Sequence, residues 1–88
     1  MQGENTGVMA GRPMSEGEIA VGLNFNPSGD PKVNRIKELC AELFDIVEKS
    51  VLADDGTIPT ARKRKMRDSA LDKIITAQMW AVKVVTFK

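Results

Sequence analysis

The sequence predicts an all-α fold, in which a short N-terminal helix precedes an antiparallel two-helix hairpin and copies of the chain assemble into a homo-oligomer. Three observations support this prediction. A capping-box sequence opens residues 16–21. Apolar residues recur at steps of three and four over residues 31–52 and again over residues 60–85. The chain has only 88 residues, so its own core is small, and oligomerisation is a common way to stabilise such a chain.

Residues 16–21 are predicted to form a short helix because Ser15 and Glu18 match the S-x-x-E pattern. The Ser15 hydroxyl can accept the amide of Glu18, and the Glu18 carboxylate can reach back to the amide of Ser15. Gly17 and Gly22 keep this helix short. Residues 1–14 contain three glycines and one proline. We therefore expect a flexible arm over 1–14 and a single helical hairpin domain over 15–88.

The first long helix is predicted over about residues 31–52. Asp30 is a favourable N-cap, and Pro31 suits the first helical position, where its missing N–H costs nothing. The apolar residues that follow form one broad stripe with the period of an α-helix. They are Val33, Ile36, Leu39, Cys40, Leu43, Ile46, Val47 and Val51.

The second long helix is predicted over about residues 60–85, after a turn that contains Gly56 and Pro59. Its apolar residues fall into two stripes. The predicted inner stripe is Met66, Ala70, Ile74, Ala77, Ala81 and Val84, and the stripe on the adjacent face is Leu71, Ile75, Met79, Val82 and Val85. One partner helix covers roughly one 100°-wide stripe. We expect another subunit to cover the second stripe, and the alternative is the N-terminal arm with the short helix.

The residue types exclude several kinds of chemistry. Cys40 is the single cysteine and the chain has no histidine, so an internal disulfide, a zinc cluster of His and Cys ligands, and a His-dependent catalytic triad cannot form within one chain. The sequence also lacks the G-x-x-x-x-G-K-[ST] and G-x-G-x-x-G motifs. We expect a protein that is not an enzyme and uses no cofactor. Cys40 and Trp80 are interpreted as core or interface residues, and Asp54-Asp55 as turn residues.

The chain shows no sign of a membrane segment. No stretch approaches the roughly 20 apolar residues of a membrane span. Residues 1–7 are polar and lack the apolar core of a signal peptide. We therefore expect a soluble intracellular protein without a membrane partner.

Positive charge is concentrated in the last third of the chain. Residues 56–88 carry eight bases and two acids, although the net charge of the whole protein is +1. Five of the bases lie within residues 62–67, at the predicted start of a helix, where arginine forks and free amides suit a phosphate. Arg64 and Arg67 lie three residues apart on one helix face. The alternative is a solvated basic face, and the low net charge argues against binding to long nucleic acid.

Phe25 lies in the turn segment over residues 24–31 and has two interpretations. It either anchors the turn to the hairpin core or stacks on a nucleobase while an asparagine amide, such as that of Asn26, reads the base edge. Lys32, Arg35 and Lys37 follow closely and can reach phosphates.

Three short segments together resemble the phage anti-CBASS cyclic-nucleotide sponges, whose helical hairpin also occurs in an anti-Thoeris sponge family. CBASS is a bacterial defence in which cyclic oligonucleotides signal infection. The segments are Asn24-Phe25-Asn26-Pro27, the helix containing Arg35-Ile36-Lys37 and Ala41-Glu42-Leu43, and Ala77-Gln78-Met79-Trp80-Ala81. The resemblance covers about residues 15–88.

The resemblance implies a compact homo-hexamer without catalytic activity. Its pockets lie between subunits and bind cyclic dinucleotides, and many members also bind cyclic trinucleotides at separate sites. Members often place Tyr-His before the proline of the turn, where this chain has Phe25-Asn26 before Pro27. The basic residue of the family's first helix falls near Lys37. An arginine associated with the trinucleotide site aligns with Arg67.

The sequence thus predicts a non-enzymatic sponge that sequesters cyclic oligonucleotide messengers in the cytoplasm of an infected bacterial host and so blocks CBASS immunity. The candidate ligand-binding residues are Phe25, Asn26, Pro27, Lys37, Arg64 and Arg67. Two alternatives remain open at this point. One is a small helical nucleic-acid-binding regulator that uses residues 62–67, and the other is a structural phage hairpin protein.

Overall fold

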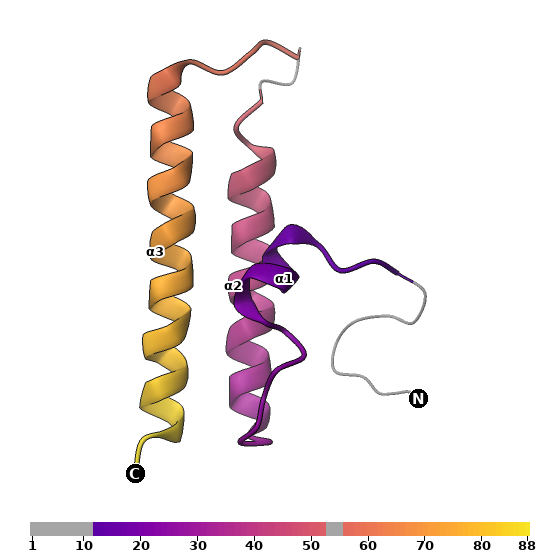
Figure 1. Cartoon of the computed structure of the whole chain (residues 1–88), viewed down its shortest axis with the longest axis vertical. Helices are drawn as coiled ribbons and strands as arrows, with labels where there is room; N and C mark the ends of the chain where they lie inside the picture. Colours follow the sequence, from indigo (N-terminus) through magenta and orange to yellow (C-terminus); the bar gives the residue numbers. More distant parts are fainter. Residues whose placement is uncertain (1–11, 53–55) are drawn as a thin grey trace.

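The structure, a computed structural model, describes residues 12–52 and 56–88. These residues form three helices and no strand: α1 (Glu16–Val21), α2 (Pro31–Lys49) and α3 (Ala61–Thr86). Figure 1 shows α2 and α3 side by side and antiparallel, as the sequence predicts for a helical hairpin. Asp54, Asp55 and residues 1–11 of the predicted arm lie outside the described residues.

The capping box predicted for α1 is confirmed. The amide of Glu18 donates to the Ser15 hydroxyl at 3.1 Å, and the amide of Ser15 donates to a Glu18 carboxylate oxygen at 2.8 Å. Gly22 ends the helix in the left-handed region at φ 64°, and the amides of Gly22 and Leu23 close the last turn on the carbonyls of Ile19 and Glu18. The chain therefore leaves α1 in a fixed direction toward the turn that precedes α2.

Gly17 sets how closely α1 approaches α2. Its amide donates to Asp45 Oδ1 at 2.8 Å. A Cβ atom at this position would clash with the backbone carbonyl oxygen of Ala41 and would lie 2.8 Å from Asp45 Oδ1, closer than real Cβ atoms approach other atoms. The missing side chain is what allows α1 to dock on α2.

Replacing Gly17 with alanine is expected to lower the free energy of unfolding by about 1–3 kcal/mol, the usual cost of overpacking a close contact. Chemical denaturation measures this loss. Glu16→Ala is the matched control, because Glu16 is exposed on the same helix. Equal stability of G17A and the control would contradict this account of α1 docking.

Both long helices match their predicted starts closely, and α2 ends earlier than predicted. Asp30 caps α2 by accepting the amide of Lys32 at 2.8 Å, and Thr60 caps α3 by accepting the amide of Lys63 at 3.1 Å. The predicted end of α2 at residue 52 is wrong by three residues. The Ser50 hydroxyl donates to the Ile46 carbonyl at 2.6 Å, and the Ser50 amide donates to the same carbonyl at 3.0 Å. These bonds close the last turn at Lys49.

The predicted inner stripe of α3 is only partly right. Ile74 is buried as predicted, whereas Met66, Ala77 and Val84 are exposed. The most buried residue of α3 is Gln78, 6% exposed, which belongs to neither predicted stripe. The contact with α2 therefore runs between the two stripes and leaves apolar residues on both sides of it. A helical period shows which side of a helix is apolar, but it does not show which residues on that side contact a partner helix.

A similar shift occurs on α2. The buried residues of this helix are Val33, Lys37, Ala41 and Phe44. Of these, only Val33 belongs to the predicted apolar stripe. Three members of that stripe, Leu39, Leu43 and Ile46, are exposed. The reason is that α1 and α3 pack on α2 from neighbouring directions, so the buried face lies between their contacts and not along the most apolar line.

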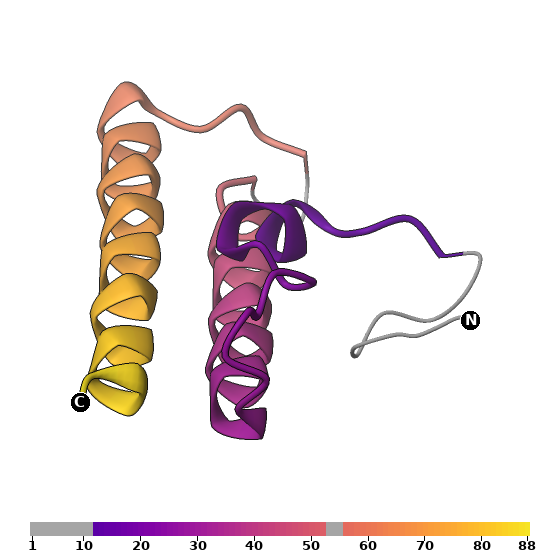
Figure 2. The same cartoon turned by 60° about the horizontal axis from the view of Figure 1, so that its bottom comes forward.

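The hairpin is thin, and α1 covers only one of its two broad faces. Its smallest extent over Cα atoms is 12 Å. Figures 1 and 2 show α1 in front of α2, and α1 packs mainly on that helix. Within the described residues the buried apolar side chains are Val21, Leu23, Val33, Ala41, Phe44 and Ile74. No helix in this part of the chain combines the length and hydropathy that crossing a membrane requires.

The other broad face, here called the open face, carries exposed apolar side chains. Leu43 lies about 200° around α2 from Ala41, where α1 docks, so it points away from α1. Ile46 and Met66 line one groove between α2 and α3, and Val84 lies five turns beyond Met66 on the same line of α3. We define the open face by Leu43, Ile46, Met66, Trp80 and Val84, all of which are exposed.

Candidate ligand-binding site

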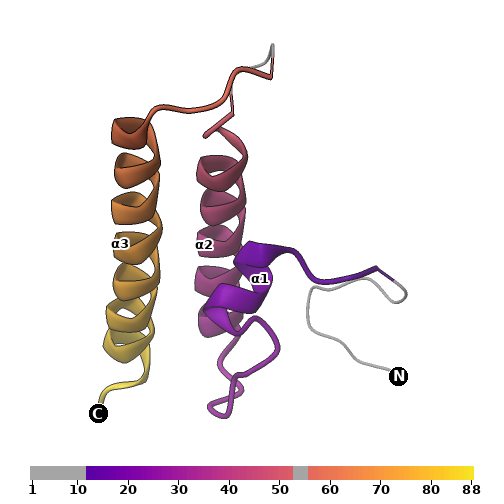
Figure 3. The same ribbon diagram turned by 45° about the horizontal axis from the view of Figure 1, so that its top comes forward.

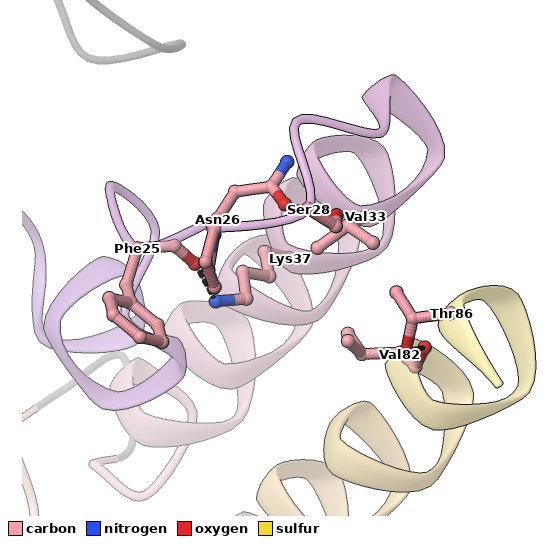
Figure 4. Close-up of a pocket in the computed structure, with 8 residues that line it drawn as sticks. Phe25, Asn26, Ser28, Val33, Lys37, Val82 and Thr86 are labelled. Carbon is pink, nitrogen blue, oxygen red and sulfur yellow. Dashed lines mark hydrogen bonds between the residues drawn. The ribbon is translucent and has the colours of Figure 1, made fainter.

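A groove of about 240 Å³ lies where the turn after α1 meets α2 and the end of α3. Figure 3 shows this turn as a loop that descends from α1 to the start of α2. Figure 4 shows the side chains from the turn on one wall and those from α3 on the other. The lining residues are Phe25, Asn26, Pro27, Ser28, Val33, Lys37, Val82 and Thr86. Four of the six predicted site residues thus meet in one place.

Phe25 presents its ring to solvent at the edge of this groove. Phe25 is 70% exposed. The backbone is fixed nevertheless, because the Phe25 amide donates to the Gly22 carbonyl at 2.9 Å. An exposed ring on a fixed backbone contributes little to the core and is available for stacking. The exposure favours the stacking interpretation of Phe25 over the core-anchor interpretation.

Asn26 is engaged within the turn. Its Nδ2 donates to the Asp30 carbonyl and to Asn34 Oδ1, both at 3.0 Å, and its Oδ1 accepts the Ser28 hydroxyl at 2.6 Å. These bonds hold the loop against the first turn of α2. Reading a base edge would require Asn26 to exchange one of them, so its direct role in this structure is to shape the turn beside Pro27.

Lys37 is buried beneath Phe25, with 6% of the residue exposed. Its Nζ donates to the carbonyls of Gly22, at 3.0 Å, and of Phe25. The same atom lies 5.5 Å from the centre of the Phe25 ring. Burial lowers the pKa of the Lys37 ammonium because it disfavours the charged form.

Sequence reasoning missed the wall of the groove that α3 provides. Val82 belongs to the predicted second stripe and Thr86 lies just beyond the helix predicted over residues 60–85, and nothing in their spacing indicates a groove. A signal for Lys37 was present, because a lysine between Val33 and Ala41 on an apolar helix face is unusual unless it has a partner.

The structure places Arg64 and Arg67 at the opposite end of the hairpin. Arg67 is 15 residues from Val82, or roughly 22 Å along α3. Arg64 Nη1 donates to the Pro59 carbonyl at 2.8 Å, and Arg67 Nε donates to Asp68 Oδ1 at 2.8 Å. Arg67 lines a separate groove of about 260 Å³ beside the end of α2. Within one chain, the six predicted site residues therefore form two groups.

An ion pair secures α1, which in turn positions the Phe25 turn. Arg12 donates to both carboxylate oxygens of Glu18, at 3.1 and 2.8 Å. The hydrogen bond from Arg12 lowers the pKa of Glu18, burial opposes this shift, and the Ser15 amide adds to the lowering. The folded protein thus holds Glu18 ionised at lower pH than the unfolded chain does.

The stability that Glu18 contributes is therefore present above about pH 4.3, the ordinary value for glutamate, and is lost as the pH falls through its lower folded pKa. Glu18→Gln is expected to flatten this acid-side loss in denaturation curves recorded between pH 2 and pH 7. Glu16→Gln is the control, since Glu16 is exposed in the same turn. An unchanged pH profile in E18Q would refute the role of this ion pair.

Residues 15–86 match the family model described as "Acb2/Tad1, hairpin domain". The match spans α1, the Phe25 turn and both long helices. The chain belongs to this family. The Acb2/Tad1 hairpin family is the anti-CBASS and anti-Thoeris sponge family, a family of binding proteins. No curated protein and no solved structure matches the chain.

Proposed function

We propose that this protein is a non-enzymatic sponge that binds cyclic oligonucleotide messengers and keeps them from their effectors, thereby blocking CBASS immunity in the cytoplasm of an infected host. The observation that carries this proposal is the exposed Phe25 ring, fixed above a buried lysine at the edge of a groove. Membership of the Acb2/Tad1 hairpin family supports it. Phe25, Asn26, Pro27 and Lys37 form the core of the proposed site.

Cyclic dinucleotides such as cyclic GMP–AMP are the proposed principal ligands, bound between two copies of the chain. The groove of one chain has about 240 Å³, whereas ligand pockets usually have about 300–1,000 Å³. A two-fold interface would bring the grooves of two copies together, which suits a ligand with two bases and two phosphates. We propose a homo-hexamer as the assembly, supported by the apolar open face and by the family.

Arg64 and Arg67 are proposed to belong to a second site, for cyclic trinucleotides. Arg62, Lys63 and Lys65 are exposed around them at the start of α3. This group is far from the Phe25 groove in one chain, which supports a separate site and not an extension of the first. A substitution at Arg67 is therefore proposed to affect trinucleotides and to spare dinucleotides.

Calorimetry with four ligands tests the proposed function. Cyclic dinucleotides and cyclic trinucleotides are expected to bind, whereas a linear dinucleotide and duplex DNA bind at least tenfold more weakly. Ligand recovered after denaturing the protein should be chemically intact, because the chain has no histidine and no phosphate-loop motif. Preference for duplex DNA would favour a nucleic-acid regulator, and protein-dependent cleavage would overturn the sponge proposal.

A further inference from the structure

We propose that two copies of the chain pair through α3, with the two helices antiparallel and in one fixed register. The contact runs along the α3 seam, which we define as Met66, Ala70, Lys73, Ala77, Trp80, Val84 and Phe87. This inference specifies a contact between copies and goes beyond the proposed function, because it requires no ligand.

The α3 seam has the spacing of a helix that packs lengthwise on another helix. Its members follow one another at alternating steps of four and three residues, a period of 3.5. All of them are exposed except Ala70, which is half-buried. Val84 lies about 200° around α3 from Val82, which lines the Phe25 groove. A partner helix on the seam therefore leaves the groove open.

The sizes of the seam residues fit a second, antiparallel copy of the same helix. Bulky members alternate with smaller ones: Met66, Lys73, Trp80 and Phe87 with Ala70, Ala77 and Val84. In an antiparallel pair centred on residue 75, Ala70 faces Trp80 of the partner subunit, and Ala77 faces Lys73 of the partner subunit. Each bulky side chain then fills the space beside a small one. In a parallel pair, Lys73 would instead face Lys73 of the partner subunit, and the contact would hold two unpaired positive charges.

The charges of α3 favour the same orientation. Five bases lie within residues 62–67, at the helix end where the dipole disfavours cations. Two of them, Arg62 and Lys63, lie beside the seam and are exposed. In the antiparallel pair they lie next to the carbonyl end of the other α3, which favours cations, and Lys63 comes beside the ring of the partner's Phe87. In a parallel pair, the two basic segments would repel each other.

The α3 contact also allows an assembly larger than a dimer. A two-fold contact uses the same surface on both copies, so one contact of this kind stops at two chains. The proposed dinucleotide contact lies at the Phe25 groove, on another side of α3 from the seam. Two different two-fold contacts on each chain link dimers into a larger closed assembly, such as the proposed hexamer.

Disulfide cross-linking of the ligand-free protein tests the orientation and the register. In a Cys40→Ser background, chains with Met66→Cys are mixed with chains with Val84→Cys under mild oxidation. These two positions face each other in the antiparallel pair, whereas the two copies of residue 66 lie roughly 27 Å apart along the helix axis, beyond disulfide reach. We expect mixed cross-links to exceed self-links by about fivefold or more, since only the mixed pair meets the distance limit.

Asp72→Cys in place of V84C is the matched control, because Asp72 is exposed on α3 and lies outside the seam. Chains with D72C should not cross-link to chains with M66C. Self-linking of both M66C and V84C without a mixed product would indicate a parallel pair and overturn the inference. If no cross-link forms at all, something other than a second α3 covers the seam, and the inference is again overturned.

Lys73→Leu provides a second measurement that needs no cysteine. A lysine in such a contact specifies register at a cost in stability. Leucine should therefore lower the dissociation constant of the assembly about tenfold or more in analytical ultracentrifugation. Lys49→Leu is the control, since Lys49 is exposed on α2 and belongs to neither the open face nor the seam. Equal dissociation constants in the two variants would count against the α3 contact. Neither experiment uses a ligand, so both decide on this contact even if no cyclic oligonucleotide binds and the proposed function fails.

Discussion

Phe25→Ala is expected to weaken cyclic dinucleotide binding on the order of tens-fold or more. Stacking of a base on an aromatic ring contributes roughly 1–3 kcal/mol, and a ligand between two copies loses that contribution twice. The fold should remain intact, because Phe25 is 70% exposed and its amide bond to Gly22 does not depend on the ring. Calorimetry measures the affinity, and circular dichroism with light scattering checks the fold and the assembly.

Phe87→Ala is the matched control for this experiment. Phe87 is 74% exposed at the end of α3 and does not line the Phe25 groove. The control therefore removes a comparable exposed ring from a different place. Full dinucleotide affinity in F25A would mean that the pocket lies elsewhere. Unfolding of F25A would instead restore the core-anchor interpretation.

Val84→Asp is expected to dissociate the proposed oligomer into monomers at micromolar concentration. Val84 is 78% exposed in the single chain, so the new carboxylate is hydrated in the monomer and leaves its fold unchanged. On assembly through the open face the same carboxylate would lose water without gaining a partner, at a cost of several kcal/mol. Each copy in a symmetric assembly carries that cost.

Thr76→Asp provides the comparison, because Thr76 is exposed on α3 and does not belong to the open face. Analytical ultracentrifugation should show wild-type assembly in T76D and monomers in V84D. A wild-type protein that is itself monomeric would refute the oligomer. An intact oligomer in V84D would exclude the open face as the interface and leave the α1 side.

The elements of this fold could be predicted from sequence because local chemistry specifies them. Ser15 and Glu18 form the capping box that their spacing predicts, and Asp30 caps α2 directly before Pro31. Each of these features depends on residues within one helical turn, so neighbours in the sequence are neighbours in space. The helix ends that lack such a signal were placed less well, as with Ser50.

The packing of the helices could not be predicted in the same way. Gln78 is buried at the hairpin contact although it is polar, and Leu43 is exposed although it is apolar. Both facts depend on the rotation of one helix against another, which a periodic pattern does not specify. The candidate site shows the same difference between features set by local sequence and features set by helix packing. Phe25 could be proposed as a site residue from its setting in the turn, whereas the inward hydrogen bonds of Lys37 depend on how α1 and α2 meet.

The protein is only 12 Å thick over its Cα atoms, so its stability depends on what it contacts. So thin a chain gains little stability from its own interior, and the proposed copies and ligand, if they bind only the folded form, would add to that stability. By mass action, its melting temperature should rise with protein concentration and rise again with the amount of captured messenger. Under the proposed function, a messenger that the host produces would therefore slow the proteolysis of the protein that binds it, because proteases act on the unfolded form.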